Sequence, residues 1–367
     1  MSLTKEKISD VNNDLDLVQN TLLKKVIRDK FKDCDYNNIQ FIKSMTYPYS
    51  SIRIVKFTDE KGNPVILFIK RITTPKKKLA DVREKLEHEA SLLQLLNKEM
   101  SGEAVELIGI FPEQQTIVTK ECTGSAIDTH INAYTFWWKN DVAQKNSRDK
   151  LALLCGSWLK RYHQTTGQQN KDLEPWYDYL SGEMLWRART LKERLPEHSK
   201  LFQEISETFR AKLKGIQQQG YTCTYHGDFS GHNIFHDEGV IKVIDFYDAK
   251  PGHPLIDLIN FIASLAYRSE NPLYPKQRIR VFCHNFLKGY GKMLGRNDEL
   301  ASLILLLQSI KRLLVLESNM PTRLDSKTIR HRASCRHIQY LEDYLLEKNN
   351  AHALGPWPFL NLTCLTS

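Results

Sequence analysis

The first third of the chain alternates apolar and polar positions in short stretches that turn-rich segments separate. Apolar residues at helical spacing over 16–32 predict an opening helix. Period-two alternation then predicts five strands, at 39–44, 51–58, 65–72, 104–111 and 115–120. Before the fourth strand, leucines recur on one side of a predicted helix at 80–98. This part of the sequence therefore predicts a small antiparallel sheet with one helix packed on it.

The pattern changes near residue 122, where long helical segments begin. They predict helices at about 149–165, 180–194, 200–219, 275–293, 299–317 and 327–348. A short strand–loop–strand region at 222–249 lies among them. We therefore expect an α+β protein of two lobes, a small antiparallel-sheet lobe at 1–121 and a larger, mainly helical lobe at 122–367.

Composition narrows the class of protein. Apolar residues make up 41% of the 367 positions and charged residues 26%, which argues against wholesale disorder and a fibrous architecture. The start of the chain is polar and lacks the apolar core of a secretory signal. The longest aliphatic stretch, around 303–307, is interrupted by Gln308, Lys311 and Arg312. We expect a cytoplasmic protein without a membrane span.

The cysteine pattern and the net charge indicate which cross-links, metals and macromolecular partners the protein can have. The seven cysteines form no CxxC pair, which argues against a disulfide framework and a structural zinc site. A net charge of +9 can attract nucleic acid, an anionic membrane or an anionic substrate. The basic cluster at 76–78 is interpreted as a solvated loop, and no RNP or zinc-finger motif accompanies it. No nucleic-acid partner is expected.

The candidate chemistry lies in the strand–loop–strand region. Residues 225–235 read YHGDFSGHNIF, and residues 243–246 read VIDF. Two apolar strands thus flank a polar turn, and each ends near a carboxylate or an amide. Phosphoryl transfer needs one carboxylate at the attacking hydroxyl and oxygen ligands for metal ions at the phosphates. Asn233 and Asp245 suit Mg²⁺, and Asp228 can face the hydroxyl from the same turn.

These two motifs, H-G-D-x₄-N and I-D-F, resemble the catalytic signature of the aminoglycoside phosphotransferase and choline kinase family. The similarity spans roughly residues 39–291. It implies a two-lobed protein-kinase-like fold that transfers the γ-phosphoryl group of ATP. It also implies that Asp228 is the catalytic base, that Asn233 and Asp245 bind Mg²⁺, and that His226 supports the loop.

The segment 248–258 is similar to a further run of the family, D-A-x-x-G-D-P-x-x-D-L. Asp257 is expected to cap a helix and to brace the catalytic loop. His253 stands where the family has an aspartate, so this part of the loop departs from the pattern. Asp248 is open to two interpretations, a group near metal or substrate and a solvent-facing turn carboxylate.

The first lobe is expected to bind the nucleotide. Lys70 interrupts the apolar strand at 65–72, and Glu89 lies nineteen residues later on the predicted helix. Kinases use a strand lysine on the phosphates and a helix glutamate that holds it, which favours this pair. On pattern alone, Lys70 fits equally well an edge lysine that reaches solvent. Glu87 is the rival of Glu89, whose surroundings are closer to the family pattern R-E-A-x-x-L.

Two more nucleotide contacts follow from the resemblance. Glu121 and Cys122 lie in a linker similar to the family's hinge, where backbone groups meet the adenine. The loop over the phosphates is expected at 45–51, where Ser50 and Ser51 can donate hydrogen bonds. This loop contains no glycine, unlike the loops that let backbone amides approach phosphates closely.

The acceptor is expected to be a small molecule with a hydroxyl group, such as a sugar, an amino alcohol, an aminoglycoside or a glycoconjugate. Two stretches are candidates for its pocket: 127–150 with Phe136-Trp137-Trp138, and 176–220 with Trp176-Tyr177-Asp178-Tyr179 and Trp186-Arg187-Ala188-Arg189. Aromatic residues at helical spacing fit a core as well as a pocket. A kinase-like scaffold with weak or no activity is the alternative function, because the phosphate loop lacks glycine.

Overall fold

The computed structural model describes residues 21, 24–28, 30–31, 39–73, 79–139, 141–216, 219–291, 299–318 and 327–346. Contacts divide the chain into two compact units, Met1–Thr123 and Gly124–Ser367. Residues 21, 24–28 and 30 of the predicted opening helix are helical. The basic cluster at 76–78 lies outside the described residues.

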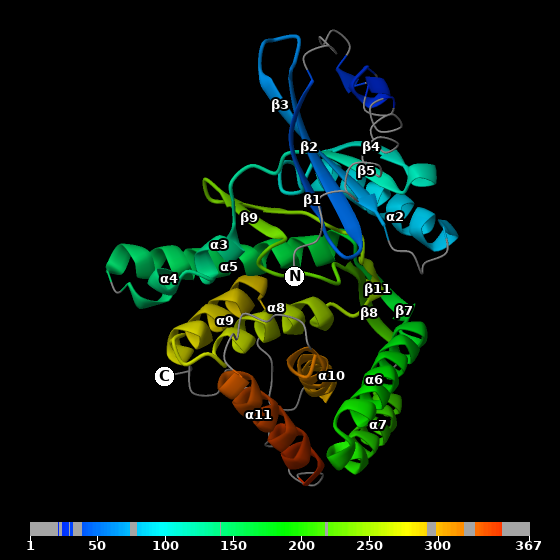
Figure 1. Cartoon of the computed structure of the whole chain (residues 1–367), viewed down its shortest axis with the longest axis vertical. Coiled ribbons are helices and arrows are strands. Elements are labelled where there is room, and N and C mark those ends of the chain that lie inside the picture. Colours follow the sequence, from blue (N-terminus) through cyan, green and yellow to red (C-terminus); the bar gives the residue numbers. More distant parts are fainter. Residues whose placement is uncertain are drawn as a thin grey trace, which may run out of the picture. The chain divides into compact units, whose positions relative to one another are not determined.

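A five-stranded sheet forms the first unit together with one long helix (Figure 1). Its strands are β1 (Gln40–Thr46), β2 (Ser50–Thr58), β3 (Pro64–Ile72), β4 (Leu107–Phe111) and β5 (Thr116–Lys120). They follow the order β1-β2-β3-β5-β4, and every neighbouring pair is antiparallel. The small antiparallel sheet predicted from the alternating pattern is therefore confirmed.

Alternate residues of the central strands point into one hydrophobic cluster. Its buried members are Val26, Ile27, Val55, Phe57, Val65, Leu67, Ile69, Ile108 and Val118. Successive side chains of a strand point to opposite faces of the sheet. Lys70 therefore lies on the face opposite to Leu67 and Ile69. Because β3 pairs with β2 on one side and with β5 on the other, Lys70 is not an edge lysine.

Helix α2 (Leu79–Glu99) packs against β4, β5 and the short 3-10 helix η3 (Pro112–Gln114). Its buried apolar residues include Val82, Leu86, Leu93 and Leu96. These positions recur every three or four residues, so they share one side of the helix. The helix predicted at 80–98 is confirmed, and its buried side is the one on which the leucines recur.

The second unit is mainly helical. Its helices are α3 (Ile127–Ile131), α4 (Tyr134–Trp138), α5 (Val142–Thr165), α6 (Glu174–Arg194), α7 (Ser199–Lys214), α8 (Leu255–Arg268), α9 (Lys276–Tyr290), α10 (Glu299–Leu316) and α11 (Lys327–Leu346), with the 3-10 helix η4 (Pro196–His198). Helix α5 packs on α9, α6 on α7, and α10 on α6, α8 and α11. Figure 1 shows α6 and α7 side by side.

Several of these helices differ from the prediction. Helices α5 and α6 begin at Val142 and Glu174 rather than near 149 and 180, and α3 and α4 were not predicted. The segment predicted to stay helical to residue 219 ends at Lys214, and β8 begins at Gln219. Helix α8 was not predicted as a separate helix. Its apolar residues are buried, while Asn260, Ser264 and Arg268 recur at helical spacing on a less buried side, so the pattern of this helix was present in the sequence.

Six short strands complete the second unit. A first sheet has the order β10-β9-β6 and a second β11-β8-β7. The strands are β6 (Ser125–Ala126), β7 (Gln168–Asp172), β8 (Gln219–Tyr225), β9 (Ile234–Asp237), β10 (Val240–Val243) and β11 (Lys250–Gly252). The strand–loop–strand region predicted at 222–249 thus belongs to both sheets.

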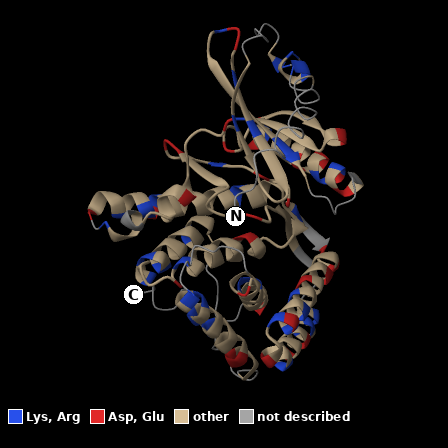
Figure 2. Cartoon of the chain, in the orientation of Figure 1, with Lys and Arg blue, Asp and Glu red and all other residues tan. Residues whose placement is uncertain are grey.

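The surface of the helices mixes both signs of charge. Acidic and basic residues are interspersed along α2 and α7 (Figure 2). Among the described residues, no helix combines the length and the apolar content needed to cross a bilayer.

Candidate active site

The three residues predicted to carry the chemistry lie on one turn and one hairpin of the second unit. Asp228 and Asn233 occupy the turn between β8 and β9. Strands β9 and β10 pair in a register that sets Ile234 against Val243, and the backbone N–H of Ile244 donates to Asn233 O at 3.0 Å. Asn233 and Asp245 therefore lie at the same end of the hairpin.

The carboxylate of Asp228 accepts hydrogen bonds from its own turn. Asn233 Nδ2 lies 3.0 Å from Asp228 Oδ2 and 3.0 Å from the Asp228 carbonyl oxygen. Ser230 Oγ donates to Asp228 Oδ1 at 3.1 Å. His232 Nε2 lies 3.2 Å from Oδ2. The carboxylate keeps 52% of its side-chain surface exposed, so it is held in place and open to a ligand.

Charge and hydrogen bonding keep Asp228 ionised. Partial burial raises the pKa of Asp228, but the hydrogen bond and the charge of His232 lower it more. The net pKa of Asp228 lies below its ordinary value. The hydrogen bond to Asp228 in turn raises the pKa of His232, and the charges of Asp128 and Asp245 add to that rise. At neutral pH, Asp228 is therefore a carboxylate that can accept a hydrogen bond from a hydroxyl.

Asn233 is oriented by these contacts. Both hydrogen bonds of its Nδ2 go to oxygen atoms of Asp228, so the amide nitrogen must face Asp228. The side-chain oxygen Oδ1 of Asn233 therefore remains available to bind a cation. The residue itself is 3% exposed.

Asp245 has an unusual backbone conformation for a residue with a side chain. Its φ is +66°, in the left-handed region. Aspartate tolerates this region better than most residues, and such conformations gather at functional sites. Within the described part of the chain, no three His, Cys, Asp or Glu side chains form a group that could hold a metal alone. Mg²⁺ commonly takes only one or two protein carboxylates, so Asn233 and Asp245 are a sufficient donor set for it.

A buried carboxylate braces the start of the turn. Asp257 accepts from the backbone N–H of His226 at 2.7 Å and from that of Gly227 at 3.0 Å. His163 Nε2 lies 3.0 Å from Asp257 Oδ2, and His163 Nδ1 lies 2.9 Å from Tyr290 OH. Asp257 makes no helix cap, because α8 begins after Pro254 without a side-chain cap. The predicted cap is therefore wrong, whereas the brace is present.

His226 joins both halves of the motif. Its Nδ1 accepts from the backbone N–H of Asp228 at 3.3 Å, and its Nε2 lies 3.0 Å from Ile244 O. Since Nδ1 accepts, the hydrogen of the ring lies on Nε2, which donates to Ile244. His226 is fully buried and spans from the turn to the residue before Asp245.

Gly227 lets the turn approach the next loop. Its φ is +83°, and a Cβ at this position would lie 2.6 Å from Asp248 O. A side chain is therefore excluded both by conformation and by space. The backbone of the Asp228 turn rests directly on the backbone of the loop that follows Asp245.

Aromatic side chains form a floor under both loops. Phe229 stacks on Trp158 with ring centroids 5.8 Å apart, and His226 packs on Phe246 at 4.7 Å. Trp158 also lies 6.4 Å from Phe246. Phe229, Phe246 and Trp158 are fully buried. Phe229 directly follows Asp228 and Phe246 directly follows Asp245, so the same packing positions both carboxylates.

In the first unit, the structure distinguishes Glu89 from Glu87. Glu89 is 3% exposed on the buried side of α2. Glu87 is about half exposed and accepts from Arg83 at 2.9 Å, one turn earlier on the helix. Glu89 is therefore the glutamate that the fold directs inward. Lys70 lies on the central strand of the same unit and is partly buried.

The predicted phosphate loop is shorter than expected. Only Tyr47, Pro48 and Tyr49 lie between β1 and β2, and Tyr47 N donates to Ser50 O at 2.7 Å. Ser50 and Ser51 are the first two residues of β2 rather than loop residues. At the end of the unit, the backbone N–H of Glu121 donates to Ile66 O at 2.9 Å. This bond extends the pairing of β3 and β5 to Glu121, and Cys122 follows outside the sheet.

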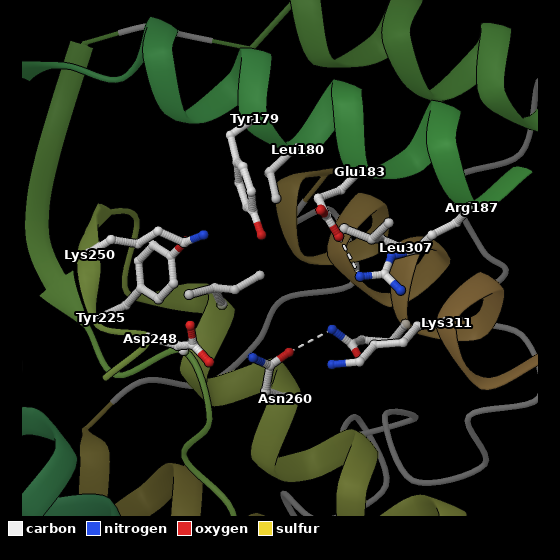
Figure 3. Close-up of a pocket in the computed structure, with 13 residues that line it drawn as sticks. Tyr179, Leu180, Glu183, Arg187, Tyr225, Asp248, Lys250, Asn260, Leu307 and Lys311 are labelled. Atoms are coloured by element: carbon white, nitrogen blue, oxygen red, sulfur yellow. Dashed lines mark hydrogen bonds and ion pairs between the residues drawn. The ribbon is translucent and has the colours of Figure 1, made fainter. Parts of the chain in front are cut away.

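A pocket of about 250 Å³ lies beside the Asp228 turn, within the second unit (Figure 3). Its walls come from α6, α8, α10 and the loops around β8 and β11. The lining residues are Tyr179, Leu180, Glu183, Arg187, Tyr225, Gly227, Asp248, Lys250, Ile256, Asn260, Leu307, Gln308 and Lys311. Gly227, directly before Asp228, connects the pocket to the turn.

Only one of the two stretches predicted for an acceptor pocket lines it. Helix α6 supplies Tyr179 and Arg187, whereas Trp137 of α4 is fully buried and donates from Nε1 to Ile131 O at 2.7 Å. Trp137 is thus a core residue. Asp248 lines the pocket, which favours the substrate interpretation of this carboxylate over the solvent-facing one.

The prediction missed Ser230 and His232 beside Asp228, and the contribution of α10. Ser230 and His232 stood inside the motif as variable positions. Gln308 and Lys311 were visible as polar interruptions of an apolar segment. A polar residue on an otherwise buried helix is a signal for a lined cavity.

Comparison with known proteins identifies the family and the fold of the chain. The sequence model of the phosphotransferase enzyme family (APH) matches residues 55–295, well over half of the chain. No curated protein matches the sequence. The chain is also similar to solved structures, but at such low sequence identity that the similarity shows only the fold.

Three solved structures illustrate that fold. A choline kinase from Cryptosporidium parvum has a TM-score of 0.55 at 11% identity, over 89% of this chain and 96% of that chain. The amicoumacin kinase hAmiN in complex with AMP-PNP, Ca²⁺ and Ami has a TM-score of 0.53 at 18% identity, over 93% and 96%. A glucosamine kinase has a TM-score of 0.52 at 13% identity, over 84% and 95%. The kinase-like fold predicted from the motifs is confirmed, and this chain belongs to the phosphotransferase enzyme family.

Proposed function

We propose that this protein is an ATP- and Mg²⁺-dependent kinase that phosphorylates a hydroxyl group of a small molecule. The observation that carries the proposal is the meeting of Asp228, Asn233 and Asp245 on one braced turn and hairpin. Family membership supports phosphoryl transfer as the reaction class.

Asp228 is the proposed base. In the reaction, the acceptor oxygen bonds to the γ-phosphorus, the bond from that phosphorus to the β–γ bridging oxygen breaks, and ADP leaves. The proton of the acceptor hydroxyl passes to Asp228. The contacts of Ser230 and Asn233 support this role, because they fix the carboxylate in one orientation.

Asn233 and Asp245 are the proposed Mg²⁺ ligands. Mg²⁺ bound there supplies positive charge that stabilises the phosphate oxygens during transfer. The side-chain oxygen of Asn233 and the carboxylate of Asp245 are the hard donors that this ion prefers. The strained backbone of Asp245 holds its side chain at the end of the hairpin.

The first unit is the proposed nucleotide-binding lobe, at 1–121, and the rest of the chain the catalytic lobe. Lys70 is assigned to the ATP phosphates, with Glu89 as its partner, since Glu89 is buried on α2 and Lys70 lies on the central strand of the sheet. Ser50 and Ser51 at the β1–β2 turn face the phosphates, and Glu121 and Cys122 contact the adenine through their backbone. The AMP-PNP in the amicoumacin kinase structure supports ATP as the donor.

Isothermal titration with ATP tests the proposal, with and without Mg²⁺. We expect Mg²⁺-dependent binding, followed by ADP release when a suitable acceptor is added. The glycine-free turn at Tyr47–Tyr49 favours one alternative, a kinase-like scaffold without turnover. Nucleotide binding without ADP release across a broad set of hydroxylated metabolites supports the scaffold, and absence of nucleotide binding overturns the kinase.

A further inference from the structure

The pocket beside Asp228 carries more positive than negative charge. Five charged side chains line it: Glu183, Arg187, Asp248, Lys250 and Lys311. Glu183 and Arg187 form an ion pair one turn apart on α6, so their charges cancel. Asp248 then faces two lysines. A bound ligand therefore meets one positive charge in excess.

Lys250 is fixed in place by aromatic rings. Its Nζ lies 3.6 Å from the centroid of the Tyr179 ring and 6.0 Å from that of Tyr225 (Figure 3). Both rings line the pocket too. An ammonium over an aromatic face is held without loss of its charge, so it remains able to attract an anion.

Lys311 reaches into the pocket from α10. No carboxylate of the described residues forms an ion pair with its ammonium group. Figure 3 shows its amine beside Asn260, whose Oδ1 accepts from Gln308 Nε2 at 2.5 Å. The side chain is exposed and lines the pocket.

No direct ion pair from the described part of the chain compensates the partial desolvation of the Lys311 ammonium. Burial lowers the pKa of Lys311, and the charge of Arg187 lowers it further. The charges of Asp228, Glu183 and Asp248 act in the opposite direction, so these carboxylates lie within electrostatic reach of the amine. A ligand anion at Lys311 would add a direct ion-pair partner and favour the charged ammonium.

We propose that the acceptor carries an anionic group, a carboxylate or a phosphate, which binds Lys311 and Lys250 while its hydroxyl faces Asp228. This inference rests on the proposed kinase function. One wall of the pocket is formed by Gly227 and Asp248, next to Asp228, and another by α10, which carries Lys311. One compact molecule can therefore contact Lys311 while its hydroxyl group lies near Asp228. The cavity of about 250 Å³ lies at the lower edge of the usual range for ligand pockets, roughly 300–1,000 Å³. It therefore selects an acceptor of monosaccharide size.

Calorimetric titration in the presence of Mg·ADP tests the inference without requiring turnover. Four probes share one scaffold: glucose, glucosamine, glucuronate and glucose 1-phosphate. We expect one of the two acids to bind about 10- to 100-fold more tightly than glucose, as a charge-assisted hydrogen bond predicts. The two acids distinguish a carboxylate site from a phosphate site. Glucosamine is expected to bind more weakly than glucose.

The matched variants are Lys311→Met and Lys145→Met. Lys145 lies on the exposed side of α5, outside the pocket. Lys311→Met is expected to remove the preference for the acid, and Lys145→Met to retain it. Lys311→Glu should reverse the preference in favour of glucosamine, which a merely unfolded variant cannot do.

The outcomes separate this inference from the proposed function. Equal affinity for all four probes, a preference for glucosamine, or no binding of either acid at millimolar concentration overturns the anionic acceptor. An unchanged preference in Lys311→Met overturns it as well. Failure of the wild-type protein to bind Mg·ATP overturns the kinase function instead, because that measurement contains no acceptor.

Discussion

The carboxylate of Asp257 accepts a hydrogen bond from the backbone N–H of His226 at 2.7 Å, inside the protein and away from water. Its other oxygen accepts from the N–H of Gly227 at 3.0 Å. The two residues are far apart in sequence, yet this contact sets the position of the residue that follows them, Asp228. The Asp228 turn is therefore positioned by a buried carboxyl group on α8.

Replacing Asp257 tests that arrangement. Asp257→Asn keeps the volume but turns one acceptor into a donor, which then opposes a backbone N–H or His163. We expect a loss of about 3 kcal/mol in the free energy of unfolding, measured by urea denaturation. Turnover should fall even at temperatures where the variant is folded. Asp178→Asn on the exposed side of α6 is the control, and an equal loss there would contradict the bracing role.

The role of Asp228 is tested by Asp228→Asn. The amide cannot take the proton of the acceptor, so we expect kcat to fall by about 10²–10⁴-fold, the usual contribution of a general base. Affinity for Mg·ATP, measured by calorimetry, should remain close to that of the wild type. Asp237→Asn, whose carboxylate pairs with Lys242 on the neighbouring hairpin, is the control. A fully active Asp228→Asn variant would refute the assignment.

Asp245 is expected to act on nucleotide binding rather than on proton transfer. Asp245→Asn tolerates the left-handed backbone but loses the negative charge. Loss of an outer-shell partner of a bound metal typically lowers affinity by about 10- to 100-fold. The affinity for Mg·ATP should fall by at least that much, because Asp245 is a proposed direct ligand. Higher Mg²⁺ concentrations should restore part of the affinity. Binding that is unaffected by the variant and by EDTA would speak against a metal at this position.

Two glycines give a paired test of the fold. Gly227→Ala forces a β-carbon into a left-handed position 2.6 Å from Asp248 O, so we expect a loss of at least about 2 kcal/mol in stability. Gly182→Ala lies on α6, where a β-carbon meets nothing within 4 Å. This second variant should gain about 0.5–1 kcal/mol, because alanine has less backbone freedom to lose. Thermal or urea denaturation measures the stability of both variants. Equal changes in stability for Gly227→Ala and Gly182→Ala would contradict the close approach at Gly227.

The pH dependence of stability should report on Glu270. This buried carboxylate contacts Arg312 and lies 2.9 Å from His337 Nε2. Burial raises the pKa of Glu270, but the hydrogen bond from His337 and the charge of Arg312 lower it more, to a net value below the ordinary one. Because the pKa of Glu270 is lower in the folded state than in the unfolded state, its ionised carboxylate stabilises the fold at pH values above the unfolded-state pKa. That stability is lost as the pH falls through the folded pKa.

We therefore expect Glu270→Gln to be less stable than the wild type by about 3 kcal/mol at pH 7, because Arg312 loses its partner. The difference should shrink as the pH falls below about 4, where the wild-type carboxylate becomes protonated too. Urea denaturation between pH 3 and 7 measures it. Glu197→Gln at an exposed site is the control. A difference that grows at low pH would contradict the depressed pKa.

Part of the candidate site could be predicted because its residues lie close together in the sequence. Asp228 and Asn233 are five residues apart, and a polar turn between two apolar strands brings such residues together in any fold that contains it. The same holds for the alternating strands of the first unit. Lys70 is different, since its pattern fitted an edge strand as well as a central one. Only the strand order decided that β3 is central.

The spacing of Asp228, Asn233 and Asp245 along two strands and a turn could be read from the residue pattern alone. What surrounds these three residues depends on the folding of the whole second unit. Lys311 and Asp257 reach the turn from α10 and α8, and their positions depend on how buried helices pack against each other. Packing of this kind is set by contacts between residues distant in sequence, and a local pattern of apolar and polar positions carries no record of which helices meet.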